Sequence, residues 1–381
     1  MTESSKKIPS RTAHRMVLAS GAFYLLIAFE FFYMASPFAA YFYAVYGPGL
    51  DTLQEWGLSG WMLWFFLPHI VAETKSALIN FTPLLGKFLF LSGLFAFAMG
   101  AFQVYRAKIC KLGVVTGGLY RHIRHPQYSA LIVASLGMLL IWPRFLVLYS
   151  TIAMVFAYAA LARVEERICA EAFVSYDKYL SRTAGFFPKV FGNFRGPQIS
   201  GGVPRLTVCI ASFVLILVAG TLIALSLRQH AIASLYTLQD KQGTYLSVTR
   251  LSDKELSHIS AIARTHQETG VALSTLNESD RFIAYVLPTQ MYISEIPMML
   301  PEGQIFGHSI PESLNSDRYK VIYTRAEFPI DGLPESENIL YHALNKHPLI
   351  EVHINLSTEA VEQVFQPPEQ NFYPDVQVPV F

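Results

Sequence analysis

Long runs of apolar residues limit most strongly what this chain can fold into. A helix needs about 20 apolar residues to cross a bilayer, and such runs occur at Met16–Ser36, Leu85–Tyr105 and Leu206–Leu227. Of the 381 residues, 52% are hydrophobic and 15% are charged, whereas soluble domains contain roughly 25% charged residues. The sequence therefore predicts a multi-span membrane protein.

Two further apolar segments, Tyr128–Ile141 and Phe145–Ala162, are separated only by Trp142-Pro143-Arg144. Proline stops the first helix, so we expect a tight turn and a helical hairpin over residues 128–163. Gly57–Pro68 is rich in tryptophan and short, which favours an interfacial segment over a spanning one. The predicted membrane core is therefore all-α, with about five transmembrane helices.

Basic residues predict how the chain is oriented. Residues 1–15, 106–126 and 163–205 all carry an excess of Lys and Arg, which is typical of cytoplasmic loops. With five spans, the N-terminus is expected in the cytoplasm and the C-terminal region on the exoplasmic side. The net charge of +1, without a basic stripe, argues against a nucleic-acid partner.

Residues 231–381 are predicted to form a soluble α+β domain. Arg281–Leu287, Tyr319–Tyr323 and Leu349–Ile354 have the pattern of strands, and Glu337–Asn345 that of a helix. Ser252-Asp253-Lys254-Glu255 predicts a capping box that starts a helix ending near His266. The histidines of this region are scattered without ligand spacing, so we expect no metal site.

The resulting division has four parts: 1–84 with the first span and the interfacial segment, 85–195 as the membrane core, 196–230 as linker and last span, and 231–381. The three cysteines all precede residue 231. An exoplasmic domain without a disulfide framework favours a bacterial inner membrane over a secretory compartment.

The most distinctive polar stretch is Gly117–Tyr128, GGLYRHIRHPQY. The glycine pair allows a sharp turn and close approach of backbone to a ligand. Arg124 and His125 offer hydrogen-bond donors, and Pro126 suits the first turn of a helix, whose amides can bind an anion. Glu165 and Glu166 end the second hairpin helix, so they are expected at the same membrane face. These groups suit a zwitterionic ligand that bears a base; the alternative is a basic cytoplasmic loop that forms salt bridges with the two acids.

The run Leu112–Tyr128, the hairpin with Gly137 and then Glu165-Glu166 resemble the isoprenylcysteine carboxyl methyltransferase and phospholipid methyltransferase superfamily. The resemblance covers about Leu85–Pro188 and rests on an RHPxY motif followed by two glutamates. The chain departs from the family pattern at Ala130, where many relatives have glycine. It also departs at Phe173–Tyr176, which is one residue short and lacks a glycine.

The resemblance implies S-adenosyl-L-methionine as cofactor and an acceptor that enters from the bilayer. The implied cofactor-binding residues are Leu112, Gly113, Val114, Val115, Tyr120, His125, Pro126, Gln127, Tyr128 and Glu165. Arg163 is the nearest match to an arginine that faces the acceptor in the family, and Glu166 is a candidate base. We therefore predict both as catalytic residues.

The leading hypothesis is an integral membrane methyltransferase that acts on a lipidic or prenylcysteine-like acceptor through a carboxylate, amine or thiol. A second hypothesis is a non-catalytic membrane sensor with a degenerate core, whose exoplasmic domain binds a ligand or partner. A reductase that uses a nicotinamide cofactor is a third, but the sequence has no dinucleotide fingerprint.

Overall fold

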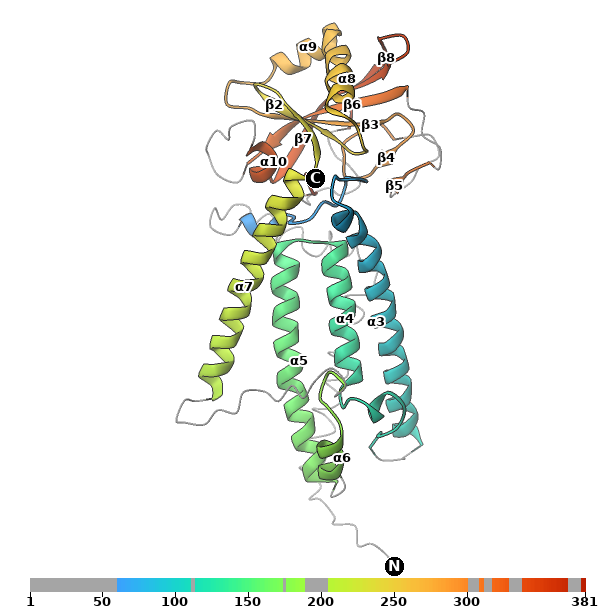
Figure 1. Cartoon of the computed structure of the whole chain (residues 1–381), viewed down its shortest axis with the longest axis vertical. Helices are drawn as coiled ribbons and strands as arrows, with labels where there is room; N and C mark the ends of the chain where they lie inside the picture. The colour runs from blue at the N-terminus through green and yellow to red at the C-terminus, as the bar shows by residue number, and fades with distance from the viewer. Residues whose placement is uncertain are drawn as a thin grey trace, which may run out of the picture.

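The computed structural model describes residues 60–110, 114–173, 176–188, 205–300, 308–311, 317–328, 338–368 and 378–381. The predicted first span, Met16–Ser36, lies outside these residues, as do positions 57–59 and most of the predicted linker. Figure 1 shows long helices that extend from one end of a C-terminal α+β region.

Within the described residues, the membrane part contains four apolar helices: α3 (Ala77–Ile109), α4 (Pro126–Ile141), α5 (Phe145–Ala172) and α7 (Arg205–Ala233). Of these, α3, α5 and α7 are long and apolar enough to cross a bilayer, and α4 is shorter. The outward faces of α3 and α7 carry large exposed apolar side chains, among them Leu84, Phe88, Leu91, Phe95, Leu215 and Leu222. The described residues thus contain three candidate spans, and the count of about five remains a prediction.

Helix α3 starts eight positions before the expected Leu85, because local hydrogen bonds compensate for a proline. Pro83 lies inside the helix and has no N–H to donate to the carbonyl of Ile79. The Thr82 hydroxyl donates to that carbonyl at 2.7 Å instead. The helix can therefore include the polar stretch before Leu85.

Glycines let α3 and α4 pack closely. A Cβ atom at Gly137 would lie 2.3 Å from the Phe90 amide nitrogen, and one at Gly93 would lie 2.6 Å from that of Ala134. Small residues at a contact let helix backbones approach in a membrane, where van der Waals packing drives association. The α4–α5 hairpin turns at Trp142-Pro143-Arg144, as predicted.

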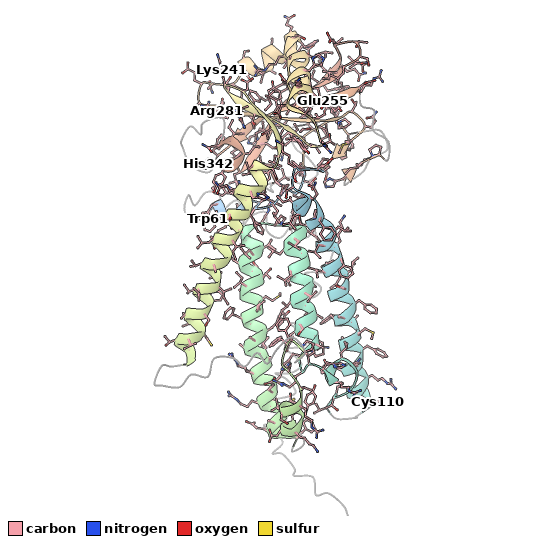
Figure 2. The ribbon with its side chains drawn as sticks, in the orientation of Figure 1. Trp61, Cys110, Lys241, Glu255, Arg281 and His342 are labelled. Atoms are coloured by element: carbon pink, nitrogen blue, oxygen red, sulfur yellow. The ribbon has the colours of Figure 1, made fainter. Side chains whose placement is uncertain are left out.

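Residues 60–76, which precede α3, run beside the hairpin turn. Among these described residues there is one short helix, η1 (Gly60–Leu63). The amide of Phe66 donates to the Pro143 carbonyl at 2.8 Å, and the amide of Ala72 donates to Val248 of the C-terminal region at 2.9 Å. In Figure 2, Trp61 lies near this junction and Cys110 lies at the far end of the helices.

The C-terminal region contains a mixed six-stranded sheet with the order β1-β2-β3-β6-β7-β8. Among the described strands of this sheet, β2 and β3 alone pair in parallel, and β4 and β5 form a separate antiparallel pair. The strands are β1 (Tyr236–Gln239), β2 (Gly243–Ser247), β3 (Phe282–Pro288), β4 (Tyr292–Ile293), β5 (His308–Ser309), β6 (Arg318–Glu327), β7 (Asn345–Asn355) and β8 (Ala360–Phe365). The helices are α8 (Asp253–Thr265), α9 (Gln267–Ser274) and α10 (Ile339–His342).

Most sequence-based expectations for this region are confirmed. The capping box forms, with the Glu255 amide donating to Ser252 Oγ at 3.3 Å and the Ser252 amide donating to Glu255 Oε2 at 2.8 Å. The three predicted strands are β3, β6 and β7. The predicted helix Glu337–Asn345 is wrong in extent, because the Leu344 amide already donates to Glu327 and Asn345 starts the pairing of β7 with β6.

The sheet is buried on both faces by different parts of the chain. Leu256, Ile259 and Ala263 of α8 cover one face, and the other face packs against Ile70 from the segment before α3. Ile70 is only 1% exposed. The core of the C-terminal region is therefore completed by residues that precede the membrane helices.

Arg228 near the end of α7 strengthens this junction. Its guanidinium is 1% exposed and donates to three backbone carbonyls: Phe65, Leu340 at 3.2 Å and Tyr341 at 2.7 Å. It also lies over the rings of Trp64, Tyr341 and Phe381, at 5.0 to 5.3 Å from their centroids. One side chain thus links α7, the segment before α3 and the C-terminal region.

Candidate functional site

The predicted polar site forms at the end of the helices opposite the C-terminal region (Figure 1). Three segments meet there: the loop between α3 and α4, the last turns of α5, and the segment that contains α6 (Tyr176–Arg182). The loop includes a short 3-10 helix, η2 (Gly118–Arg121). The topology follows from the tight hairpin turn, which returns α5 to the end where α4 began.

Glu166 of α5 forms hydrogen bonds with the loop. Its Oε1 atom accepts from Arg124 Nε at 2.6 Å and lies 3.0 Å from His125 Nε2. The side chain of Glu166 is 24% exposed, that of Arg124 15% and that of His125 5%. These contacts are thus partly shielded from water, which strengthens charge-assisted hydrogen bonds.

Glu165 binds the neighbouring part of the loop. Its Oε1 atom accepts from the Tyr128 hydroxyl at 2.7 Å, and its Oε2 atom lies 3.5 Å from His125 Nδ1. The His125 ring therefore has a carboxylate at each nitrogen. Burial of the ring lowers the pKa of His125, but the bonds and charges of the two carboxylates outweigh this effect and raise it above 6.5. This environment favours the imidazolium form.

An aromatic stack extends from His125 into the helix bundle. The His125 and Tyr128 rings are stacked with centroids 5.5 Å apart, and Tyr128 stacks on Tyr158 of α5 at 4.9 Å. Phe186 packs against the cluster that contains Tyr128 and Tyr158, with its ring centroid 5.6 Å from that of His125. The stack holds His125 in one orientation and makes one wall of the site apolar.

The segment 176–188 completes the site. The Arg124 amide donates to the Ala184 carbonyl at 2.8 Å, and the His125 amide donates to Gly185 at 3.1 Å. Arg124 Nη1 donates to the carbonyls of Leu180, at 3.2 Å, and Thr183. The Tyr179 hydroxyl donates to the Tyr120 carbonyl at 2.6 Å. Hydrogen bonds of backbone and side chains thus connect the loop both to α5 and to the segment 176–188.

The structure brings together some of the predicted residues but not all. His125, Pro126, Tyr128, Glu165 and Glu166 are adjacent. Val114 and Val115 are half-buried at the start of the described loop. Tyr120 is the buried residue of η2, and Gln127 lies against α3, with its Cγ 3.1 Å from where a Cβ of Gly100 would be. Leu112 and Gly113 lie outside the described residues.

Arg163 does not join the cluster. Its side chain is exposed and lies 3.9 Å from Cys209 Sγ of α7, whereas Glu165 and Glu166 contact the loop. Glu165 follows Arg163 by two positions, and residues two apart on a helix do not face each other. Glu166 follows by three positions, but its carboxylate is held by Arg124 and His125 of the loop.

Sequence reasoning did not select Gln103, Tyr158, Tyr179 or Phe186 for the site. The tyrosine spacing and the Phe186-Phe187-Pro188 ending were visible signals for the segment after α5. Gln103 and Tyr158 stand inside apolar runs and have no local motif. Their place at the site follows only from the packing of α3 and α5.

The site offers groups suited to S-adenosylmethionine. Gln103 Oε1 is buried and accepts no hydrogen bond among the described residues, and it lies next to Gly118, whose positive φ of 61° favours glycine. Glu165 is 34% exposed on its side chain, so a cationic ligand can reach it. The first-turn amides of α4 have no acceptor within the helix and can bind a carboxylate.

Comparison with known proteins gives a family match for part of the chain. Residues 83–175 match the family described as "Phospholipid methyltransferase", which confirms the resemblance in the segment that holds the loop and both glutamates. The chain is also 35% identical over 102 residues to the cobalt-zinc-cadmium resistance protein CzcN of Cupriavidus metallidurans.

This similarity covers 26% of the chain and 44% of CzcN, so the chain spans less than half the length of that relative. No solved structure matches the chain. The part of the chain that resembles phospholipid methyltransferases is therefore residues 83–175, which contain most of α3 and all of α4 and α5.

Proposed function

We propose, starting from the phospholipid methyltransferase match over residues 83–175, that this chain is an integral membrane methyltransferase dependent on S-adenosyl-L-methionine. The acceptor is a lipidic or prenylcysteine-like molecule that presents a carboxylate, amine or thiol. The observation that carries the proposal is the pairing of both glutamates with the RHPxY loop through His125.

The cofactor supplies a methyl group on a sulfonium, and the chain supplies binding and orientation. We assign cofactor binding to Leu112, Gly113, Val114, Val115, Tyr120, His125, Pro126, Gln127, Tyr128 and Glu165, and we add Gln103 on the evidence of its buried amide oxygen. Methyl transfer depends mainly on alignment and exclusion of water. The aromatic wall of Tyr128, Tyr158 and Phe186 serves both needs.

The contacts favour positioning roles over acid–base roles for two residues. The two carboxylates raise the pKa of His125 and so favour its protonated form, which has no lone pair with which to accept a proton. Glu166 already accepts from Arg124 and His125, so its main task is to hold the loop. Arg163 contacts Cys209, and a role at the acceptor requires that the acceptor path pass between α5 and α7.

The positive-inside distribution supports a cytoplasmic N-terminus and site, with the C-terminal region exoplasmic in a bacterial inner membrane. The acceptor then reaches the site from the cytoplasmic half of the bilayer. Reporter fusions near residues 10, 50 and 240 test this orientation. A cytoplasmic residue 240 contradicts it.

The direct test uses the purified full chain, methyl-labelled S-adenosylmethionine and a lipid extract. We expect label in the lipid fraction with the wild-type chain and loss of transfer in His125→Ala and Glu165→Ala. Glu171→Gln is the matched control, since Glu171 is exposed on the same helix. Full activity in both site variants contradicts the assignment.

A second candidate is a non-catalytic membrane sensor. The observation in its favour is the C-terminal sheet, which lies outside the family match and has its own buried core. Cofactor binding without transfer to any lipid, protein or volatile fraction favours this reading. In that case the C-terminal region binds a ligand or partner on the exoplasmic side.

A further inference from the structure

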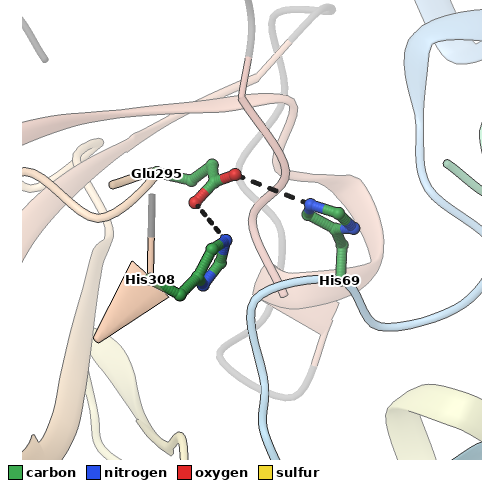
Figure 3. A group of neighbouring side chains, drawn as sticks. All are labelled: His69, Glu295 and His308. Carbon is green, nitrogen blue, oxygen red and sulfur yellow. Dashed lines mark ion pairs between the residues drawn. The ribbon is translucent and has the colours of Figure 1, made fainter. Parts of the chain in front are cut away.

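A second polar cluster lies at the junction between the membrane part and the C-terminal region. His69 belongs to the segment before α3, Glu295 follows β4, and His308 begins β5. Figure 3 shows the Glu295 carboxylate between the two imidazole rings. Antiparallel pairing of Ile293 with His308 brings β5 beside Glu295, and docking of the segment before α3 adds His69.

The distances in this cluster suit metal ligation. His308 Nε2 lies 3.2 Å from Glu295 Oε2, and His69 Nε2 lies 3.6 Å from Glu295 Oε1. One ligand atom from each residue falls within 4.8 Å of the others. Ligand atoms on a tetrahedral Zn²⁺ ion, at bonds of about 2.0–2.2 Å, are about 3.3 Å apart. Small rotations of the side chains therefore complete such a geometry.

Neighbouring groups orient two of the three candidate ligands. His69 Nδ1 lies 3.0 Å from the Ile141 carbonyl oxygen, which can only accept, so Nδ1 carries the proton and Nε2 presents a lone pair toward Glu295. The His69 ring also stacks on Trp142, with centroids 4.1 Å apart. Ser294 Oγ donates to Glu295 Oε2 at 2.9 Å. Metal-binding histidines and carboxylates typically have such outer hydrogen bonds.

Charge gives a further reason for a cation here. The Glu295 side chain is 4% exposed, and a buried carboxylate needs a positive partner. A divalent ion neutralises it while both imidazoles stay neutral. The His308 side chain is 36% exposed, so ions and water can reach the site.

We propose that His69, Glu295 and His308 form a binding site for one divalent transition-metal ion of the Zn²⁺ class. Two imidazoles with one carboxylate suit Zn²⁺, Co²⁺ or Ni²⁺, whereas Mg²⁺ and Ca²⁺ prefer all-oxygen ligands. Three protein ligands leave the fourth position of a tetrahedral ion open to water or a small ligand. The ion joins the segment before α3 to the C-terminal region, so its binding stabilises this junction.

The test titrates Zn²⁺ and Co²⁺ into the full chain, purified in detergent, with its affinity tag removed and bound metal stripped by a chelator. We expect one ion per chain and thermal unfolding that shifts upward with metal concentration, because the ion binds the folded state. His308→Ala and Glu295→Gln should weaken binding at least about tenfold, the effect that even outer-shell changes reach. Ser294→Ala should have a smaller effect.

His258→Ala is the matched control. His258 forms a single ion pair with Glu359 at 3.6 Å, outside any three-residue group of this kind in the part of the chain that the structure describes. This variant should bind metal as the wild type does. If His258→Ala weakens binding as much as His308→Ala, the proposal is overturned.

Because His308 is partly exposed, its replacement should not prevent folding. His308→Cys adds an independent readout, since a cysteine ligand should give the Co²⁺ form a thiolate-to-cobalt charge-transfer band. If the wild type binds no stoichiometric metal, or His308→Cys lacks that band while still folded, the three residues form only His–Glu ion pairs. None of these readouts depends on methyl transfer.

Discussion

Replacement of Glu166 by glutamine tests whether the loop and the cofactor site act as one unit. Glu166 accepts hydrogen bonds from Arg124 at 2.6 Å and faces His125 at 3.0 Å. A charge-assisted bond of this kind contributes about 1.5–3 kcal/mol. Since these side chains are partly accessible, we take the lower value, which gives about 3 kcal/mol for both bonds.

Glutamine keeps the shape of the side chain and one acceptor oxygen, so the variant should retain about a third of this stabilisation. If the loop becomes ordered when S-adenosylmethionine binds, the net loss of about 2 kcal/mol appears in full as a roughly 30-fold weaker affinity. Isothermal titration of the purified chain with the cofactor measures this change directly. Glu171→Gln, on the exposed face of the same helix, should change affinity less than about twofold.

A double variant sharpens the test. If Glu166 acts through Arg124, then Glu166→Gln and Arg124→Gln should not be additive, and the double variant should bind about as weakly as the worse single variant. An affinity within twofold of wild type in folded Glu166→Gln refutes the reasoning. It would mean that the loop keeps its position without the tie to α5.

Three further predictions concern stability. The pKa of His125 is raised above 6.5, so its contribution to folding stability is fully present below pH 6.5 and is lost as the pH rises through the raised pKa. The thermal unfolding midpoint of the wild type should fall over this pH range, and that of His125→Gln should not show this fall. Arg228→Met leaves three backbone carbonyls without their donor and should destabilise the chain by about 3 kcal/mol. The control Arg318→Met, at an exposed arginine, should cost less than about 1 kcal/mol. Equal shifts of the two variants in denaturant unfolding contradict the role of Arg228. Gly137→Ala places a methyl group 2.3 Å from a backbone nitrogen of α3 and should cost about 1–3 kcal/mol by overpacking, and an unchanged midpoint contradicts the close approach of the two helices.

Local sequence patterns predicted those helices and turns that are determined by residues close together in the chain. Apolar runs predicted α5 and α7, Pro143 predicted the hairpin turn, and the capping box predicted the start of α8. The RHPxY loop and the two glutamates could be placed on one face because a tight hairpin returns the chain to where it began. The hydrogen bonds of Glu165 and Glu166 with the loop confirm that placement.

The predicted ends of two helices were wrong because hydrogen bonds that the local pattern does not show changed where each helix starts or stops. The span expected to start at Leu85 begins at Ala77, because the Thr82 hydroxyl donates to the Ile79 carbonyl, which Pro83 leaves without an amide donor. The helix expected over Glu337–Asn345 ends early, since pairing with β6 gives the backbone of β7 a better set of partners.

The sequence by itself determined that this chain has a helical membrane part, a polar loop that faces two acids, and a sheet-forming C-terminal region. Only the tertiary structure decided that Ile70 completes the core of that sheet, that Arg163 points away from the acids, and that His69 meets Glu295 and His308. Hydrophobic periodicity and turn chemistry act over a few residues and can be read along the chain. Contacts between distant segments depend on how whole helices and sheets pack together, and this packing cannot be predicted from a short sequence pattern.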